Sequence, residues 1–201
     1  MTFADKPTLH GTSVILRPFT PRDIEAMGSV LADPEVIRLT GSANSTADTL
    51  GTSPELDEKT RDWYSSRADQ TDRLDLAVID RATDECVGEV VLNDWSSDDE
   101  SCNFRVLIGP RGRGRGLGME ATALLLDHAF STLPLHRIEL EVFAFNPRAR
   151  HVYERSGFVV EGTRRDAFVF DGERIDAIVM SILRPEWEAR SHAPGASSPL
   201  S

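Results

Sequence analysis

Arginine and glycine alternate in the segment Arg111 to Gly118, just past the middle of the chain. Glycine at every second position cannot form a core, because glycine has no side chain to bury and loses backbone entropy when ordered. An apolar run typical of a strand, Phe104 to Ile108, precedes the segment, and a helical pattern begins at Leu117. Bare N–H groups at a helix N-terminus attract anions, and arginine adds planar donors for phosphate. The segment therefore predicts a phosphate-binding loop, a local positive island in a chain of formal net charge -11.

Two common phosphate loops do not fit this segment. The loop of nucleoside triphosphatases ends in Gly-Lys-Ser/Thr, whereas Leu117, Gly118 and Met119 stand here. The dinucleotide-binding fingerprint needs a parallel βαβ unit near the start of a domain, but here several predicted antiparallel strands come first. An Arg-Gly segment that contacts RNA is a further alternative.

The spacing Arg113-x-x-Gly116-x-Gly118 resembles the pyrophosphate-binding signature of the GNAT N-acetyltransferases, which use acyl-coenzyme A. This six-residue pattern is only moderately specific. The second half of the family motif must therefore be sought further along the chain.

That second half follows at the separation typical of the family. Residues 137–143 alternate apolar and polar side chains as a strand does. Asn146 and Pro147 are typical of the start of a helix, and Gly157 of its end at a left-handed cap. In detail these residues resemble the branch that acetylates N-terminal alanine or serine amines of ribosomal proteins. The resemblance covers residues 9–187 in organisation and residues 104–183 in specific motifs.

The resemblance implies a GNAT fold of the α/β (α+β) class. We expect a mixed, mostly antiparallel, V-splayed sheet of six to seven strands with helices on both faces. Its 201 residues suit one domain, which we place at residues 1–187. The tail at residues 188–201 is rich in Ala, Ser, Pro and His, a composition typical of disorder.

Local patterns predict the individual elements. The expected strands are residues 12–19, 74–79, 87–95, 102–108 and 137–143, and the expected helices before the glycine segment are 21–31, 35–39 and one that begins at Ser53-Pro54.

Composition excludes several classes of protein. The N-terminus lacks the basic start and apolar core of a signal peptide. No apolar run approaches the ~20 residues that span a bilayer. Only Cys86 and Cys102 are present, with no Cys-x-x-Cys pair, and the histidines are scattered, so neither a disulfide framework nor a metal site is predicted. We expect a cytoplasmic protein that binds no membrane.

The resemblance also implies a position for the cosubstrate, acetyl-CoA, between residues 103–108 and 137–143. Backbone groups of the first strand would bind the pantetheine arm, and N–H groups of the loop would bind the pyrophosphate. Asn146 would contact the pantetheine, and Tyr153 would protonate the departing sulfur. The implied cofactor-binding residues are Leu107, Ile108, Arg113, Gly114, Arg115, Gly116, Leu117, Gly118, Met119 and Asn146.

Two glutamates compete for the role of the base that deprotonates the amine. Glu141 lies five residues before Asn146 and twelve before Tyr153, the spacing of the ribosomal alanine N-acetyltransferases. Glu89 is its rival. Each could instead be an ordinary strand glutamate, and Tyr153 could be part of the core.

The acceptor is less well defined. Acidic loops at residues 55–62 and 94–100 would attract a cationic amine and repel nucleic acid. The branch favours a peptide or ribosomal-protein N-terminus, while a polyamine or an aminoglycoside is an alternative. A non-catalytic acyl-CoA-binding module is the alternative from another class. The family habit also suggests a homodimer.

Overall fold

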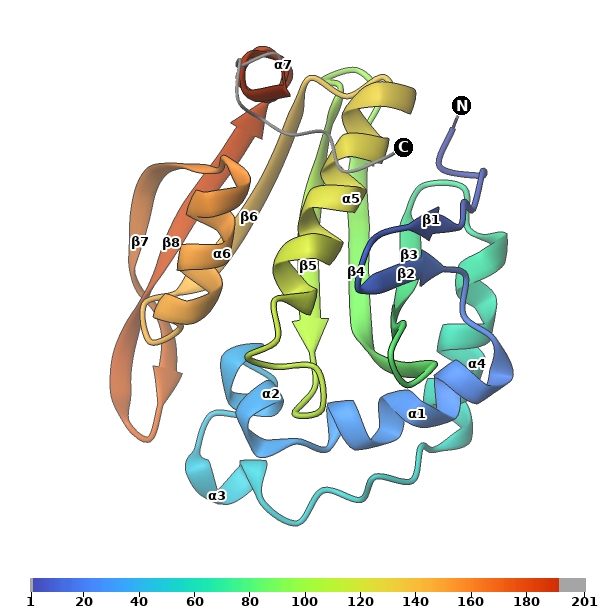
Figure 1. Cartoon of the computed structure of the whole chain (residues 1–201). Coiled ribbons are helices and arrows are strands. Elements are labelled where there is room, and N and C mark those ends of the chain that lie inside the picture. The colour runs from blue at the N-terminus through green and yellow to red at the C-terminus, as the bar shows by residue number, and fades with distance from the viewer. Residues whose placement is uncertain (1, 192–201) are drawn as a thin grey trace.

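One sheet runs through the computed structural model, which describes residues 2–191 (Figure 1). Its eight strands follow the order β1-β2-β3-β4-β5-β6-β8-β7. They are β1 (Leu9–His10), β2 (Val14–Arg17), β3 (Leu74–Asp80), β4 (Glu85–Ser96), β5 (Ser101–Ile108), β6 (Arg137–Phe143), β7 (Val159–Phe170) and β8 (Glu173–Leu183). The sequence predicts six to seven strands. The eighth is β1, too short to show in a sequence pattern, which pairs with β2.

The pairing of β5 with β6 differs from every other pairing in the sheet. These two strands are parallel, and they share three residue pairs, from Ser101↔Arg137 to Asn103↔Glu139. All other neighbours are antiparallel. Because β5 continues to Ile108 and β6 to Phe143, the strands diverge beyond the third pair (Figure 1). The mostly antiparallel, V-splayed sheet is thereby confirmed.

Side chains satisfy the first N–H groups of several helices. Thr20 caps α1 in a reciprocal capping box with Asp23, Asp33 caps α2, and Asn146 caps α6. The helices are α1 (Pro21–Leu31), α2 (Pro34–Leu39), α3 (Thr46–Thr49), α4 (Glu58–Ser65), α5 (Leu117–Thr132), α6 (Pro147–Ser156) and α7 (Arg184–Ser191), with a 3₁₀ turn at Ser66–Asp69.

Apolar clusters lie on both faces of the sheet. The larger one packs α5 and α6 against the sheet, with Phe104, Leu125 and Tyr153 among its buried members. The smaller one packs α1 and α4 against the opposite face, and it includes Met27 and Tyr64. Figure 1 shows α5 and α6 lying across the sheet on the viewer's side. The predicted arrangement of helices on both faces is confirmed.

The long β7–β8 hairpin is tied to the segment that carries α3. The Asn44 side chain donates to the carbonyl of Val169, and Thr46 donates to Asp171 through both its N–H and its hydroxyl. A segment early in the chain is thus fixed against the end of the hairpin, beside the region where β6 diverges from β5 (Figure 1).

Several boundaries differ from the expected ones, and two of them lie at a helix start and at the domain limit. The helix expected from Ser53 begins at Glu58, because the side chain of Asp57 accepts from the Thr60 N–H and provides the cap. The expected domain limit at residue 187 falls inside α7, which continues through Ser191. The rest of the predicted tail, residues 192–201, lies outside the described residues.

The rings of Phe104, Tyr153 and Phe158 pack together beneath α6, and removal of the Phe158 ring should destabilise the fold. Phe158 is 3% exposed, and its ring lies 5.9 Å from the rings of both Phe104 and Tyr153. Phe158→Ala should lower the free energy of unfolding in urea by about 3–5 kcal/mol, since it opens a cavity. Val160→Ala, at a residue of β7 that is 41% exposed and lies two positions after Phe158, should change it by less than ~0.5 kcal/mol. Equal losses in the two variants would contradict this packing.

Candidate active site

A cleft of about 880 Å³ opens where β5 and β6 diverge. The first turn of α5, the inner side of α6 and the end of α2 complete its walls. Of the site residues predicted from the sequence, it is lined by Glu89, Leu107, Ile108, Arg113, Gly114, Gly116, Leu117, Gly118, Met119, Glu141, Asn146 and Tyr153. The fold thus brings together two regions that are distant in the sequence, and Arg115 is the one predicted residue outside this lining.

One edge of β5 faces the cleft. Its other edge pairs with β4 as far as Ile108, whereas its pairing with β6 ends at Asn103. Backbone groups of Phe104 to Ile108 therefore face the cleft without a strand partner. Backbone N–H and C=O groups need a hydrogen-bonding partner. An extended chain that carries amides, such as a pantetheine arm, has the groups to satisfy them.

The glycine loop forms a cradle at one end of the cleft. Gly114 and Gly116 have φ angles of 71° and 80°, which favour glycine. A Cβ atom added to either residue would meet nothing within 4 Å, so both face open space. No side chain caps α5, and its first N–H groups lie beside this space. The cradle fits a phosphate group held by backbone donors.

The arginines of the loop do not form the expected positive island. Arg111 pairs with Glu85 at 2.8 Å, Arg113 with Asp33 at 2.5 Å, and Arg115 with Asp80 at 2.5 Å. Their acidic partners come from distant parts of the chain, so the sequence pattern alone did not reveal the pairing. Each loop arginine is thus paired with an acid, and the expected contact of Arg113 and Arg115 with phosphate stays a prediction.

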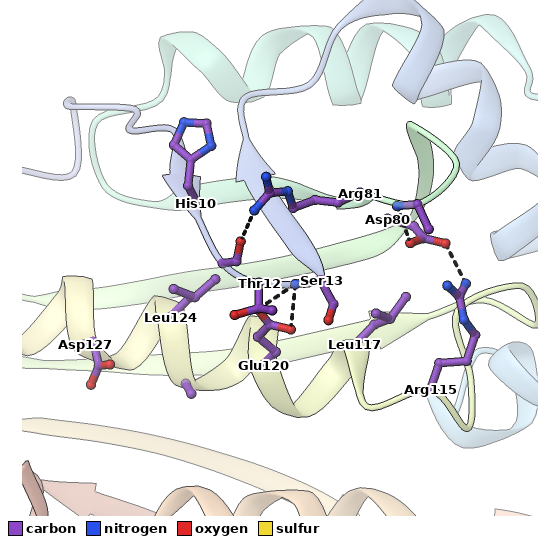
Figure 2. Close-up of a pocket in the computed structure, with 13 residues that line it drawn as sticks. His10, Thr12, Ser13, Asp80, Arg81, Arg115, Leu117, Glu120, Leu124 and Asp127 are labelled. Carbon is purple, nitrogen blue, oxygen red and sulfur yellow. Dashed lines mark hydrogen bonds and ion pairs between the residues drawn. The ribbon is translucent and has the colours of Figure 1, made fainter. Parts of the chain in front are cut away.

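Arg115 lines a different hollow, which Figure 2 shows between α5 and the β1–β2 turn. There its guanidinium donates to Asp80, a carboxylate that is 2% exposed, and this hydrogen bond lowers the pKa of Asp80. In the same hollow Glu120 of α5 accepts from the Ser13 N–H, and Arg81 donates to the carbonyl of Gly11. These contacts hold the loop and α5 against the β1–β2 turn. The structure thus gives Arg115 a structural contact instead of a place in the cleft.

The Arg113 and Arg148 guanidiniums are joined through α2. Arg113 bonds to Asp33 and Glu35, and Arg148 of α6 bonds to the other oxygen of Glu35 at 2.7 Å. The Arg113 side chain also donates to the carbonyl of Ile108. The start of α2 is therefore attached to both the glycine loop and α6, across one end of the cleft.

Glu89 of β4 is the buried carboxylate of the cleft. The residue is 4% exposed, and its Oε2 has no hydrogen-bond partner within residues 2–191. Burial raises the pKa of Glu89 to about 7, and the charge of Asp75 adds to this rise. The positive charge of Arg105 and the phenol of Tyr64 act in the opposite direction. Such a carboxyl group can accept or release a proton near neutral pH.

Glu141 has a different environment. Its carboxylate forms an ion pair with Arg164 of β7 at 2.5 Å, and its side chain is 45% exposed. It lies on β6 opposite Val179 of β8. The base expected from motif spacing is therefore engaged by a cation, whereas Glu89 keeps a free oxygen.

Tyr153 comes from α6 and packs edge-on against Phe104, with ring centroids 6.2 Å apart. The residue is 7% exposed, and burial raises the pKa of its phenol to about 12. The phenol therefore keeps its proton at neutral pH, as a general acid must. Both expected uses of Tyr153, core packing and a place at the cleft, are compatible with this position.

Asn146 has a structural role, because its side-chain oxygen accepts a hydrogen bond from the Ala149 N–H and caps α6. It also lines the cleft. Its expected contact with the pantetheine arm stays a prediction.

Two residues of the site were not identified from the sequence. Arg105 of β5 lines the cleft, and Tyr64 of α4 lies close to Glu89 in the layer formed by α1 and α4. Arg105 was visible in the sequence only as a charged residue between apolar ones, a pattern that ordinary exposed strand positions share. Tyr64 had no such signal, since its position depends on how α4 packs.

Comparison with known proteins agrees with this geometry. Residues 13–159 match the family model described as an acetyltransferase (GNAT) domain. The chain belongs to the GNAT family of acyltransferases. Within the described residues no group of three or more His, Cys, Asp or Glu side chains could hold a metal ion, and no helix has the length and apolar character of a membrane span.

Relatives of this GNAT protein include a spermidine N(1)-acetyltransferase of Vibrio cholerae, 36% identical over 85 residues, or 42% of this chain and 49% of the relative. A Bacillus subtilis protein named as a ribosomal N-acetyltransferase, YdaF, is 30% identical over 101 residues, or 50% and 55% of the two chains. Each match thus spans about half of the relative's length. The crystal structure of a Vibrio cholerae spermidine N-acetyltransferase with CoA and spermine superposes with a TM-score of 0.75, at 24% identity, covering 89% of this chain and 99% of that one. This last likeness shows the fold.

The cradle gives a test of cosubstrate binding. Gly116→Ala places a methyl group in the space beside the start of α5 and should weaken acetyl-CoA binding at least tenfold in calorimetry. Gly172→Ala, in the β7–β8 turn, is a matched control because Gly172 has the same φ of 80° and equally open surroundings. Both substitutions should lower stability by about 1 kcal/mol. Unchanged affinity in a folded Gly116→Ala variant would disprove the cradle.

Proposed function

We propose that this protein is an acetyl-CoA-dependent N-acetyltransferase that acylates a primary amine, with Glu89 as general base and Tyr153 as general acid. The observation that carries the proposal is the placement of these groups. A buried carboxylate with a free oxygen and a protonated phenol line one cleft, beside an unpaired strand edge and a glycine cradle.

The two groups reach the cleft from opposite layers. Glu89 lies on the same face of the sheet as Leu107, its partner in register, which packs with α1 and α4. Tyr153 belongs to the layer of α5 and α6. A thioester held in the gap between β5 and β6 would have the attacking amine on one side and the sulfur on the other. This division suits acyl transfer, in which one group removes a proton and another supplies one.

Glu89 supports the first half of the reaction. An amine attacks only after it loses its proton, and a carboxylate with a pKa near 7 is ionised often enough, and basic enough, to take it at neutral pH. Its free Oε2 provides the acceptor atom, directly or through one water. We assign the role to Glu89 instead of Glu141 because Arg164 already binds the Glu141 carboxylate.

Tyr153 supports the second half. When the tetrahedral intermediate collapses, the carbon–sulfur bond breaks and the sulfur becomes a thiolate that must be protonated or stabilised. A buried phenol with a pKa of about 12 holds its proton until such a strong negative charge develops beside it. Residues Gly114 to Gly118 would hold the far end of the cosubstrate, and so fix the thioester relative to both groups.

The acceptor is a primary amine, and the relatives' names point to two kinds. The peptide N-terminus favoured by the sequence agrees with the name of one relative, while the polyamine alternative agrees with that of the other. Glu139 and Glu141, two of the acids that line the cleft, form ion pairs with Arg137 and Arg164. The negative charges of these two carboxylates are therefore balanced by arginines.

Glu89→Gln tests the base. It should lower kcat about 100-fold or more while leaving the dissociation constant for acetyl-CoA unchanged, because the amide cannot take a proton. In the unaltered protein kcat should rise with pH through a midpoint near 7, and this rise should vanish in the variant. Glu141→Gln is the control and should keep most of the activity. Loss of activity in Glu141→Gln alone would assign the base to Glu141.

The burial of Glu89 also has a consequence for stability that does not depend on activity. The pKa of about 7 in the folded protein lies above the ordinary value of 4.5, so Glu89 stays protonated to a higher pH in the folded state than in the unfolded chain. Its contribution to stability is full below pH 4.5 and is lost as the pH rises through 7. The difference in unfolding free energy between Glu89→Gln and the unaltered protein should therefore increase over this range. A constant difference would show that the carboxyl group titrates normally.

Tyr153→Phe separates chemistry from packing, because it removes one oxygen and keeps the ring against Phe104. If the phenol protonates the sulfur, kcat should fall roughly tenfold or more. Acetyl-CoA affinity and the urea midpoint should change little, since the lost interaction is made mainly in the transition state. A variant with unaltered turnover across the pH range would show that Tyr153 only fills space.

A further inference from the structure

We propose that Arg105 binds an anionic group of the acceptor, and that the acceptor is an amine with a carboxylate next to the reacting nitrogen, as in a free amino acid. This inference rests on the proposed function and names the substrate class of the same site. It follows from the position of Arg105, from its lack of a partner and from the charges around it.

Arg105 lies on β5 at the point where the cleft begins. In the register of β4 and β5 it stands opposite Val91, while Glu89 stands opposite Leu107. Arg105 and Glu89 are therefore diagonal neighbours on one face of the sheet, a relation that separates Cβ atoms by about 7–8 Å. The positive charge of Arg105 also lowers the pKa of both Glu89 and Tyr153, as expected for a guanidinium near the two groups. It thus lies beside the place where acyl transfer is proposed.

Arg105 differs from the other arginines of the cleft in having no partner. Arg113 and Arg148 are bound by acids of α2. Arg105 is exposed and makes no hydrogen bond or ion pair with any residue in the range 2–191. A guanidinium presents a fixed fork of N–H donors that matches a carboxylate. Its open donors at the cleft therefore suit a ligand that supplies this group.

The charges nearby do not satisfy it. Glu139 and Glu141 form ion pairs with Arg137 and Arg164, and Asp94, which keeps its charge, accepts a hydrogen bond from the side chain of Asn93 and forms no ion pair with Arg105. Glu89, buried and with a raised pKa, carries only part of a charge at neutral pH. Arg105 is therefore a cation of the cleft that no carboxylate of residues 2–191 binds directly.

An amino acid would match this arrangement. Its carboxylate is two bonds from the amine, so binding to Arg105 would leave the nitrogen on the side of Glu89, where its proton can be removed. A polyamine would instead place ammonium groups beside the Arg105 guanidinium, and such like-charge contacts oppose binding. Arg105 would therefore select for carboxylate-bearing amines and against polycations.

The test compares amines that differ only in the carboxylate. We would measure thiol release from acetyl-CoA with a panel of the twenty L-amino acids, their matching amides and spermidine. The best amino acid should exceed its own amide at least tenfold in kcat/KM, and spermidine should be poorer still. Arg105→Gln should abolish that preference by raising KM for the amino acid while leaving the amide unchanged. Arg105→Lys, which keeps the charge but not the fork, should fall between.

Arg165→Gln is the matched control, because Arg165 of β7 is exposed and is likewise without an ion pair or hydrogen bond in the described part of the chain. It should leave all acceptors unaffected. Two results would overturn the inference. One is preference for spermidine or for the amides in the unaltered protein, and the other is an equal loss of kcat with every amine in Arg105→Gln, which would make Arg105 a stabiliser of the transition state. If no amine releases thiol from a protein that binds acetyl-CoA, the proposed function fails, and the inference on Arg105 with it.

Discussion

The site exists because β5 and β6 stop pairing after only three residues, at the pair Asn103↔Glu139. Continued pairing would satisfy the edge of β5 and close the sheet, leaving neither a cleft nor open backbone groups. Its end leaves a gap that two layers of helices can reach, and this is why Glu89 and Tyr153 can approach one volume from opposite faces. The aromatic contacts of Tyr153 with Phe104 and Phe158 keep α6 at that gap.

Environment, more than residue type, distinguishes the two glutamates. Glu89 and Glu141 both line the cleft, but one is buried with a free oxygen and the other is exposed and bound to Arg164. Burial disfavours the charged form of a carboxyl group, and a neighbouring guanidinium favours it. The same two effects explain why a motif could place both residues at the cleft yet could not choose between them as base.

The sequence predicts well what depends on near neighbours. The caps at Thr20, Asp33 and Asn146 and the glycine turn before α5 follow rules that act over a few residues, and they appear in the structure as expected. The ion pairs of the loop arginines could not be predicted because their partners are distant: Arg115 is 35 residues from Asp80 and Arg113 is 80 residues from Asp33. The depth at which Glu89 is buried and the isolation of Arg105 have the same non-local origin, since they depend on how the layers pack.

The pairing of the loop arginines changes how a phosphate must be bound. A phosphate in the cradle would meet backbone N–H groups at the start of α5, because the guanidinium of Arg113 is already shared between Asp33 and Glu35. The backbone N–H groups are fixed by the helix and do not depend on the ion pairs of Arg113 with Asp33 and Glu35. A phosphate can therefore bind at this helix end without breaking an ion pair. The arginines then act as supports that attach the loop to α2, to β3 and to β4, and the glycines present the donors. Arg105, which no acid of residues 2–191 binds, lines the inner cleft, and this difference separates the end that we propose binds the cosubstrate from the end that we propose selects the acceptor.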